Sequence, residues 1–232
     1  MNVTIKNLNV AYGDKVIFDN FNYQFKENEI TCLLGKSAVG KSTLLNALAN
    51  LVPYEGEIDV GTISYIFQED RLVPNLSIGK NLELVLKSVV KDKAERKARV
   101  KDMLKKVELE GEERAIKKEL SGGMAQRVNI ARAFLYPSDV LLLDEPFKGL
   151  DPSTKNHLIK TFLKLYEELR RTVVFVTHAI DEALLLADRV VMIKDSPVTI
   201  ADEIEITLPK SERALSDDAL ACIRKKLLSC YE

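Results

Sequence analysis

The sequence contains no tryptophan, only two histidines and three cysteines, and aromatic residues make up just 6% of its 232 positions. The cysteines are odd in number and lack metal-ligand spacing, which argues against a disulfide framework and against a zinc site. They are Cys32, Cys222 and Cys230. A reducing, cytosolic compartment is therefore expected. The first ten residues lack the pattern of a signal peptide, and no run approaches the roughly 18 apolar residues of a membrane-spanning helix. Any membrane role is expected to depend on a partner chain.

Neither sign of charge dominates, because 34 basic and 35 acidic residues give a formal net charge of −1. This balance provides no argument for a nucleic-acid or membrane surface, and we expect no nucleic-acid partner. One local excess stands out, since residues 87–106 hold nine basic and three acidic residues. A solvated helix face is the simpler interpretation of this run. Contact with anionic lipid, or with a partner that favours basic surfaces, is the alternative.

The most informative stretch runs from Gly35 to Thr43 and has the spacing of a phosphate-binding loop. It follows an apolar, β-branched run at 30–34 that predicts a buried strand, and it precedes good helix formers at 44–49. In that context backbone N–H groups and a helix start bind phosphate. Every residue of the loop is a candidate nucleotide contact: Gly35, Lys36, Ser37, Ala38, Val39, Gly40, Lys41, Ser42 and Thr43. A chance glycine-rich turn is the alternative, which the flanking strand and helix disfavour.

Two side chains of this loop have specific predicted roles. Lys41 is expected to reach the β- and γ-phosphates of a nucleotide, and the Ser42 hydroxyl is expected to bind Mg²⁺. About 100 residues later, an apolar strand ends in Asp144 and Glu145. Parallel strands carry their C-terminal ends to the ligand crevice. Asp144 is therefore predicted to hold Mg²⁺ through water, and Glu145 to polarise an attacking water.

Strand and helix patterns alternate along most of the chain and predict an α/β fold. Strands are expected at 3–10, 16–18, 21–25, 30–34, 57–60, 62–67, 140–143, 172–177, 189–193 and 198–208, with a turn at 53–56. Helices are expected at 44–49, 77–87, 92–107, 153–170, 181–187 and 216–229. This order predicts a mainly parallel central sheet with an N-terminal antiparallel layer, in one domain spanning 1–232.

The section from about 76 to 136 is almost entirely helical and is predicted to be a subdomain inserted into that domain. Within it, residues at helical spacing are expected to form a buried face. They are Ala94, Ala98, Met103 and Val107. Ser121, Gly122 and Gly123 then open a further helix. An N-cap residue followed by two glycines can expose backbone N–H groups to an anion. An ordinary helix-start turn is the alternative.

The run Leu-Ser-Gly-Gly-Met-Ala-Gln at 120–126 resembles the signature of the ATP-binding cassette (ABC) family, whose ATPase subunits drive transporters. The resemblance covers nearly the whole chain and implies a P-loop NTPase fold of ABC type. It implies that Gln68 contacts the metal and the lytic water, and that Asp151 is the family's D-loop aspartate. It also implies that His178 binds the γ-phosphate and that Tyr12 stacks on adenine. Taken singly, a tyrosine in a turn is more often a packing residue, and a histidine at a strand end a surface group.

The chain departs from the family pattern at three places. Ala38 stands where another glycine is common, so this position is expected not to need a positive φ. Lys148-Gly149 replaces the more usual Ser-Ala, and Lys148 is expected to change contacts across a dimer seam. Ala179 follows His178 where aspartate is frequent. None of these changes removes a catalytic group.

Residues 67–78 and 177–190 resemble importer subunits of the nitrate, sulfonate and taurine group, which includes carriers of pyrimidine vitamin precursors. The resemblance implies that two copies close head to tail around two ATP molecules, each ATP lying between one phosphate loop and the partner's 121–123 segment. It further implies integral membrane permease subunits, a solute-binding protein, and a peripheral location on the cytoplasmic face of the membrane. An exporter subunit, a soluble cassette ATPase acting on DNA or the ribosome, and a P-loop kinase or GTPase are the alternatives.

Overall fold

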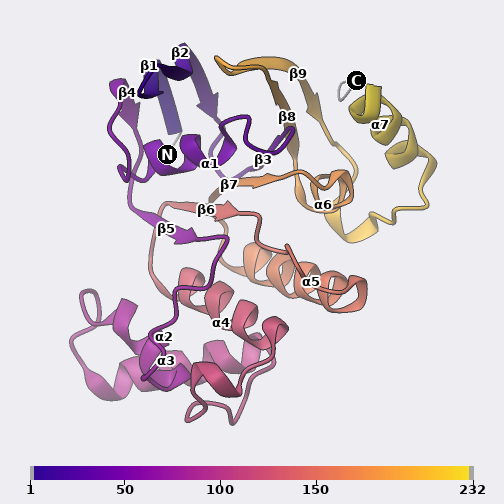
Figure 1. Ribbon diagram of the computed structural model, residues 1–232. Coiled ribbons are helices and arrows are strands. Elements are labelled where there is room, and N and C mark those ends of the chain that lie inside the picture. Colours follow the sequence, from indigo (N-terminus) through magenta and orange to yellow (C-terminus); the bar gives the residue numbers. More distant parts are fainter. Residues whose placement is uncertain (1–2, 230–232) are drawn as a thin grey trace. The chain divides into compact units, whose positions relative to one another are not determined.

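The computed structural model describes residues 3–229, so Cys230 lies outside the described residues (Figure 1). The chain divides into two compact units. Unit 1 contains residues 1–63, 139–145 and 171–232, and unit 2 contains residues 64–138 and 146–170.

An antiparallel sheet begins unit 1 and confirms the predicted N-terminal layer. Its strands are β1 (Val3–Tyr12), β2 (Lys15–Phe25) and β4 (Glu55–Asp59), in the order β2-β1-β4. The two short segments expected at 16–18 and 21–25 are one continuous strand with irregular register. The turn predicted at 53–56 is partly wrong, because β4 already begins at Glu55. Gly56 has φ +105°, and a Cβ there would lie 2.3 Å from the Asn7 carbonyl oxygen, so only glycine lets the strands approach this closely.

The main sheet of unit 1 is mostly parallel, as the sequence predicts. Its consecutive strands β6 (Val140–Asp144), β7 (Thr172–Thr177), β3 (Ile30–Leu34), β8 (Arg189–Lys194) and β9 (Thr199–Glu205) lie side by side in that order. The first four run parallel, and β9 pairs antiparallel with β8 at the edge. Every residue of β3, β6 and β7 is buried, which matches their unbroken apolar runs.

Three helices complete unit 1 (Figure 1). Helix α1 (Lys41–Leu48) packs against β6 and β7 and buries Leu44, Leu45 and Leu48. Helix α6 (Ile180–Leu186) contacts β3 and β7, and helix α7 (Asp218–Ser229) packs on α6. Contacts with these helices hold the sheet in place, and with it the segments that follow the C-terminal ends of its central strands.

Unit 2 is helical after β5 (Ile63–Ile66), the strand within which the chain passes from unit 1 to unit 2. Its helices are α2 (Ile78–Leu86), α3 (Lys93–Lys106), α4 (Gly122–Leu135) and α5 (Pro152–Glu168). Ser77 caps α2 by accepting a hydrogen bond from the Lys80 N–H, as its residue type predicts. Helices α2, α3 and α4 pack against one another, and Phe134 of α4 meets Phe162 of α5 edge to face at 5.5 Å.

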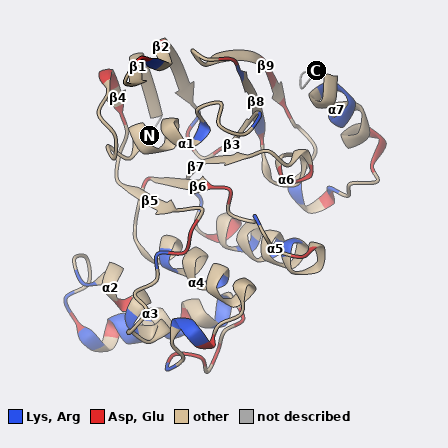
Figure 2. Cartoon of the chain, in the orientation of Figure 1, with Lys and Arg blue, Asp and Glu red and all other residues tan. Residues whose placement is uncertain are grey.

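The predicted buried face of α3 is wrong in its first half. Ala94 and Ala98 are exposed, whereas Val100, Met103 and Leu104 are buried. At 100° per residue Ala98 lies opposite the stripe formed by these three side chains, which continues to Val107. Lysines and arginines mark much of the remaining surface of α3 (Figure 2). Both interpretations of this basic run, a solvated face and contact with anionic lipid or a partner, require such exposure, so the choice between them stays a prediction.

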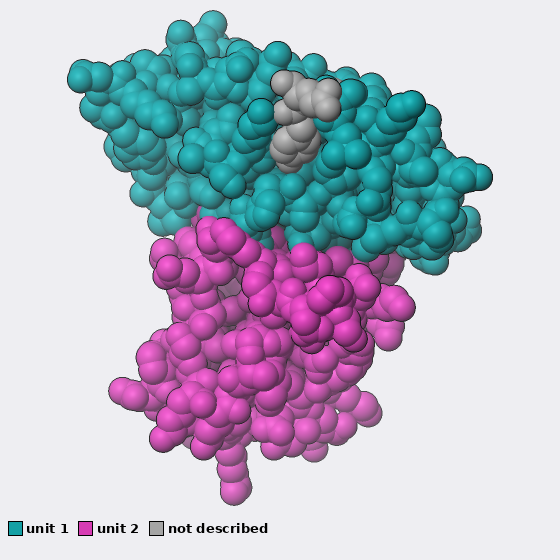
Figure 3. All heavy atoms as spheres, turned by 45° about the vertical axis from the view of Figure 1, so that its right-hand side comes forward, with its two compact units in different colours: residues 1–63, 139–145, 171–232 teal, residues 64–138, 146–170 magenta. Residues whose placement is uncertain are grey.

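Both units are assembled from segments that are distant in sequence (Figure 3). The helical section predicted at about 76–136 falls within unit 2, which also contains residues 64–75 and α5. Whether the whole chain acts as one domain stays a prediction. Among the described residues, the helices are too short or too polar to cross a membrane.

Candidate active site

Three neighbouring strands of unit 1 end at one edge of the sheet. In the parallel register Leu34 of β3 is opposite Thr177 of β7, and Asp144 of β6 is opposite Val176. The segments that follow these strands begin with Gly35, Glu145 and His178. Parallel sheets bind their ligands in the crevice at this edge. The structure therefore gathers the predicted loop, carboxylates and histidine into one site.

The loop before α1 needs glycine at two positions. A Cβ on Gly35 would lie 2.5 Å from the Ile193 carbonyl oxygen. Gly40 has φ +120°, and a Cβ there would lie 2.8 Å from Val198 Cγ2 and 2.9 Å from Ile17 Cγ2. The loop thus packs against β8, the turn after β8, and β2. These contacts hold its backbone in one curled form.

The expectation for Ala38 is wrong, because this residue has φ +62°. The curl of the loop still requires the left-handed region at the position where the family commonly has glycine. An L-residue with a Cβ adopts that region at a cost of roughly 1–2 kcal/mol. Ala38 therefore carries backbone strain within the phosphate loop.

Lys41 begins α1 and is only 5% exposed. Its Nζ donates hydrogen bonds to the Gly35 carbonyl (2.7 Å) and to the Lys36 carbonyl (2.8 Å). Charge-assisted hydrogen bonds of this kind make burial of an ammonium group tolerable. They also hold the charge inside the loop, where a bound phosphate would lie.

Ser42 and Asp144 form a pair of oxygen ligands across the same site. The Ser42 hydroxyl donates to Asp144 Oδ1 at 3.0 Å, and Asp144 is 7% exposed. Magnesium prefers hard oxygen ligands and keeps several waters, so one or two protein oxygens together with phosphates satisfy it. The donor set therefore fits Mg²⁺.

Glu145 and His178 face each other next to this pair. The His178 Nδ1 lies 3.1 Å from Glu145 Oε1, and their side chains are 49% and 11% exposed. Glu145 has φ +44°, and its N–H donates to the Val176 carbonyl at 3.0 Å. Left-handed backbone at a non-glycine residue is typical of functional sites, where surrounding contacts hold the strained form.

The roles of Tyr12 and Gln68 stay predictions. Tyr12 ends β1, pairs with Lys15 and is 50% exposed, so its ring has a face free of the core for stacking. Gln68 follows β5 and is exposed, but it belongs to unit 2, whereas the phosphate loop belongs to unit 1. The predicted contact of Gln68 with a metal is therefore untested.

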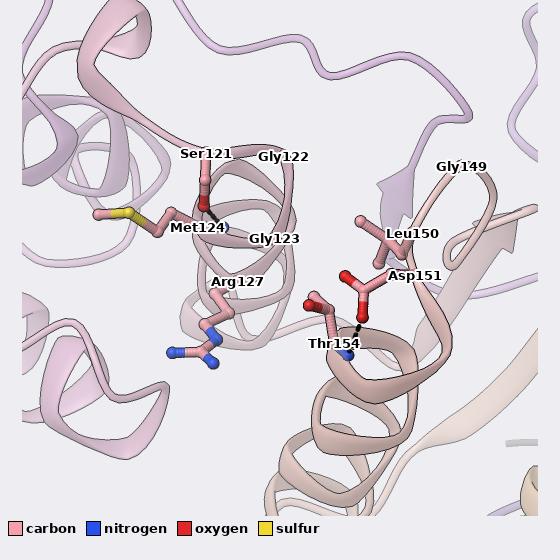
Figure 4. A pocket seen from close by; sticks show the side chains of 9 residues that line it. All are labelled: Ser121, Gly122, Gly123, Met124, Arg127, Gly149, Leu150, Asp151 and Thr154. Carbon is pink, nitrogen blue, oxygen red and sulfur yellow. Dashed lines mark hydrogen bonds between the residues drawn. The ribbon is translucent and has the colours of Figure 1, made fainter.

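The predicted second anion site is a hollow of about 340 Å³ in unit 2 (Figure 4). It is lined by Ser121, Gly122, Gly123, Met124, Arg127, Gly149, Leu150, Asp151 and Thr154. Ser121 caps α4 by accepting from the Met124 N–H at 3.2 Å. Asp151 caps α5 by accepting from the Ser153 and Thr154 N–H groups, each at 3.0 Å. Two helix starts thus meet at one hollow. The start of α4, with its two glycines, favours an anion there, whereas the start of α5 is already occupied by the Asp151 carboxylate.

The hollow contains residues that the sequence interpretation missed. Arg127 supplies a cation, and Thr154 approaches the glycines so closely that a Cβ on Gly123 would lie 2.8 Å from Thr154 Cγ2. Arg127 lies four residues after Gly123, on the same helix face, which was the available signal. Hydrogen bonds from Thr154 hold the pKa of the Asp151 carboxyl below its usual range. Asp151 is therefore a charged cap at neutral pH.

Comparison with known families gives one match that covers more than half of the chain. Residues 18–148 match the family model described as "ABC transporter". This region includes the phosphate loop, the second hollow's Ser121–Gly123 segment and the carboxylates of Asp144, which ends β6, and Glu145, which follows it.

Relatives with known names match nearly the full length. The chain is 40% identical over 233 residues to "Aliphatic sulfonates import ATP-binding protein SsuB" of Bacillus cereus (strain ZK / E33L), covering 95% of this chain and 90% of the relative. It is 39% identical over 233 residues to "Aliphatic sulfonates import ATP-binding protein SsuB 2" of Burkholderia lata, covering 95% and 83%.

Solved structures agree with the fold. A dimeric, post-hydrolysis form of the ATP-binding cassette MJ0796 bound to ADP and Pi matches with a TM-score of 0.76 and 32% identity, covering 88% of this chain and 98% of that one. A second dimeric structure of the same bacterial cassette matches with a TM-score of 0.77 and 31% identity, over the same shares. The predicted P-loop NTPase fold is confirmed.

Proposed function

We propose, from the premise that this chain belongs to the ABC transporter family of ATP-binding proteins, that it energises import of an aliphatic sulfonate or a similar small anion. The chain is an ATPase of that family. The observation that carries the proposed chemistry is the strand register that brings Gly35, Glu145 and His178 to one edge of the sheet. The cargo is supported by the names of the relatives, which are about 40% identical over most of the chain.

In the proposed site, Lys41 neutralises the β- and γ-phosphates, while the N–H groups of residues 35–43 surround them. Ser42 and Asp144 hold Mg²⁺, which when bound spreads the negative charge of the triphosphate. Glu145 accepts a proton from the attacking water, and its hydrogen-bond distance from His178 orients both side chains. His178 then contacts the γ-phosphate. Gln68 completes the metal and water contacts, and Tyr12 stacks on adenine.

The second hollow is proposed to act on the ATP of a second copy of the chain. The start of α4 and Arg127 favour an anion, and the hollow belongs to unit 2, whereas the phosphate loop belongs to unit 1. Two dimeric structures of one related cassette support an ATP sandwich, with Ser121, Gly122, Gly123 and Asp151 proposed to lie at the seam. Binding of γ-phosphate at both sides would favour the closed dimer, and hydrolysis would remove that preference.

The remaining partners follow from the proposed import role. Integral membrane permease subunits would carry the solute, a solute-binding protein would deliver it, and this chain would act on the cytoplasmic face of the membrane. An exporter subunit or a soluble cassette ATPase is the alternative, although the relatives' names favour import.

Reconstitution tests this proposal. The chain is co-expressed with the membrane proteins encoded beside its gene, purified with them, and placed in vesicles with the neighbouring solute-binding protein. ATP hydrolysis should rise when an alkanesulfonate is added, and sulfate should not replace it. Lys41→Ala should abolish that hydrolysis, whereas Lys26→Ala, a change at an exposed lysine paired with Glu29, should not. Stable hydrolysis without any copurifying membrane protein, unaffected by sulfonates, would support the soluble alternative instead.

A further inference from the structure

The backbone on either side of His178 is held in an unusual way. His178 lies between the last residue of β7, Thr177, and the residue before α6, Ala179. Ala179 occupies the N-cap position of α6 and has no side chain that can cap it. Something other than a cap must therefore fix the turn that holds the imidazole.

The Thr177 hydroxyl makes the contacts that a cap would otherwise supply. It accepts a hydrogen bond from the Ala179 N–H at 3.1 Å and donates one to Glu182 Oε2 at 2.7 Å. These two bonds connect Thr177, which precedes His178, to Ala179 and Glu182, which follow it. The last residue of the strand, the start of the helix and its first turn are thus joined through one oxygen atom.

The acceptor of this arrangement is a buried carboxylate. Glu182 is 4% exposed and Thr177 is 1% exposed. Burying a carboxylate is costly unless it is hydrogen-bonded, and charge-assisted bonds are the strong ones. The charge of Glu182 also reaches the strand beneath the phosphate loop, because, after burial, it is the next cause that raises the pKa of the Cys32 thiol. An apolar side chain would fill this space without the cost of burying a carboxylate, which indicates a role for Glu182 other than packing.

We propose that Glu182, acting through the Thr177 hydroxyl, is a positioning residue for His178. Glu182 accepts the hydrogen bond of that hydroxyl and so orients its oxygen to accept from the Ala179 N–H. This holds the backbone of residues 177–179 and keeps the imidazole within 3.1 Å of Glu145. The consequence for turnover rests on the proposed role of His178, whereas the consequence for the imidazole itself does not. The two can be measured separately.

The direct test observes the imidazole. The chain has only two histidines, so a protein labelled with ¹⁵N-histidine gives few signals, and His178→Ala assigns those of His178. Thr177→Val keeps the shape but removes both hydrogen bonds, and should shift the His178 signals while leaving those of His157 unchanged. Thr177→Ser keeps the hydroxyl and should leave both sets near their wild-type positions.

A matched control exists in unit 2. Thr161 is 4% exposed, and its hydroxyl donates to the His157 carbonyl at 3.1 Å. Thr161→Val is the same substitution at an equally buried threonine, and it should leave the His178 signals in place. The proposal is overturned if Thr177→Val leaves the His178 signals unchanged, or if Thr161→Val shifts them as much.

Kinetics provide the second measurement. Thr177→Val and Glu182→Ala should lower kcat by about ten- to a hundredfold, the scale of a misplaced catalytic group, with KM for ATP changed less than threefold. Thr177→Ser keeps a hydroxyl at position 177, and Glu182→Gln keeps an oxygen that accepts from it. Both variants should retain most of the wild-type rate. If the His178 signals move but kcat does not, the positioning inference stands and the proposed role of His178 fails. If Thr177→Val does not fold, Glu182→Ala is scored by the same signals, and unchanged His178 signals in it overturn the inference.

Discussion

The Ser42 hydroxyl donates a hydrogen bond of 3.0 Å to Asp144 Oδ1, joining the first turn of α1 to the last residue of β6. The two residues are 102 positions apart in sequence. They meet because β3 and β6 both run parallel to β7, the strand between them, so that all three end at one edge. The strand order thus brings together the proposed metal ligands, the phosphate loop and the proposed base.

Relief of strain in the phosphate loop is the first prediction. Ala38→Gly should raise the free energy of unfolding by up to about 1 kcal/mol, because the roughly 1–2 kcal/mol of left-handed strain slightly exceeds the entropy that glycine adds to the unfolded chain. Gly40→Ala should lower it, since a Cβ there meets Val198 and Ile17 at under 3 Å. Urea unfolding of the nucleotide-free chain measures both. A lower stability for Ala38→Gly would contradict the strained conformation.

The case of Ala38 shows where sequence reasoning stopped. The loop, its flanking elements and the carboxylates at the end of β6 were predictable because spacing and apolar runs are local signals. The φ of Ala38 was not, because an alanine gives no sequence signal for the left-handed region. The exposed Ala94 and Ala98 were misassigned for a similar reason, since several helix faces contain apolar residues and only tertiary contacts select one.

The second hollow shows the same division. Ser121 and the two glycines were visible as a helix start with exposed N–H groups. The helix at 153–170 and Asp151 were also predicted, but their position beside Ser121 and the approach of Thr154 were not, because α4 and α5 meet only in the folded unit. The Thr177–Glu182 bond likewise joins residues whose types alone suggest an ordinary strand and helix.

Tyr12→Ala tests the adenine contact. It should weaken ATP binding by about 1–3 kcal/mol, the usual worth of a base stacked on an aromatic ring. Tyr12→Phe keeps the ring and should bind ATP like the wild type. Titration with a fluorescent ATP analogue, with inorganic triphosphate as competitor, separates ring stacking from phosphate contacts. Equal ATP affinity in Tyr12→Ala and the wild type would refute this role.

Ser121→Arg tests whether the second hollow acts on the partner's nucleotide. The substitution places a bulky side chain at the start of α4, so it should leave ATP binding by the monomer intact yet stop cooperative hydrolysis. Equilibrium binding and steady-state ATPase assays at rising protein concentration measure the two effects. Loss of ATP binding by the monomer would indicate that Ser121 contacts the nucleotide of its own chain.

Mixing experiments sharpen this test. In a dimer of one Ser121→Arg chain and one Lys41→Ala chain, both defects can fall in one composite site and leave the other intact. Partial recovery of hydrolysis is therefore expected on mixing. No recovery, with mixed dimers demonstrated by two affinity tags, would contradict independent sites that combine one loop with the partner's hollow.

Glu145→Gln tests the central claim most directly, namely that this edge of the sheet hydrolyses ATP and that a second chain closes over it. Glutamine keeps the size but cannot accept a proton, while Ser42 and Asp144 remain as metal ligands. Hydrolysis should slow by about 10²–10⁴-fold, the usual contribution of a general base. The γ-phosphate then persists, and removal of a carboxylate beside it favours closure. Size-exclusion chromatography with light scattering should show a shift from monomer to dimer with Mg-ATP and none with Mg-ADP. Hydrolysis at the wild-type rate would contradict Glu145 as the base, and a monomer at saturating ATP and high protein concentration would contradict the sandwich.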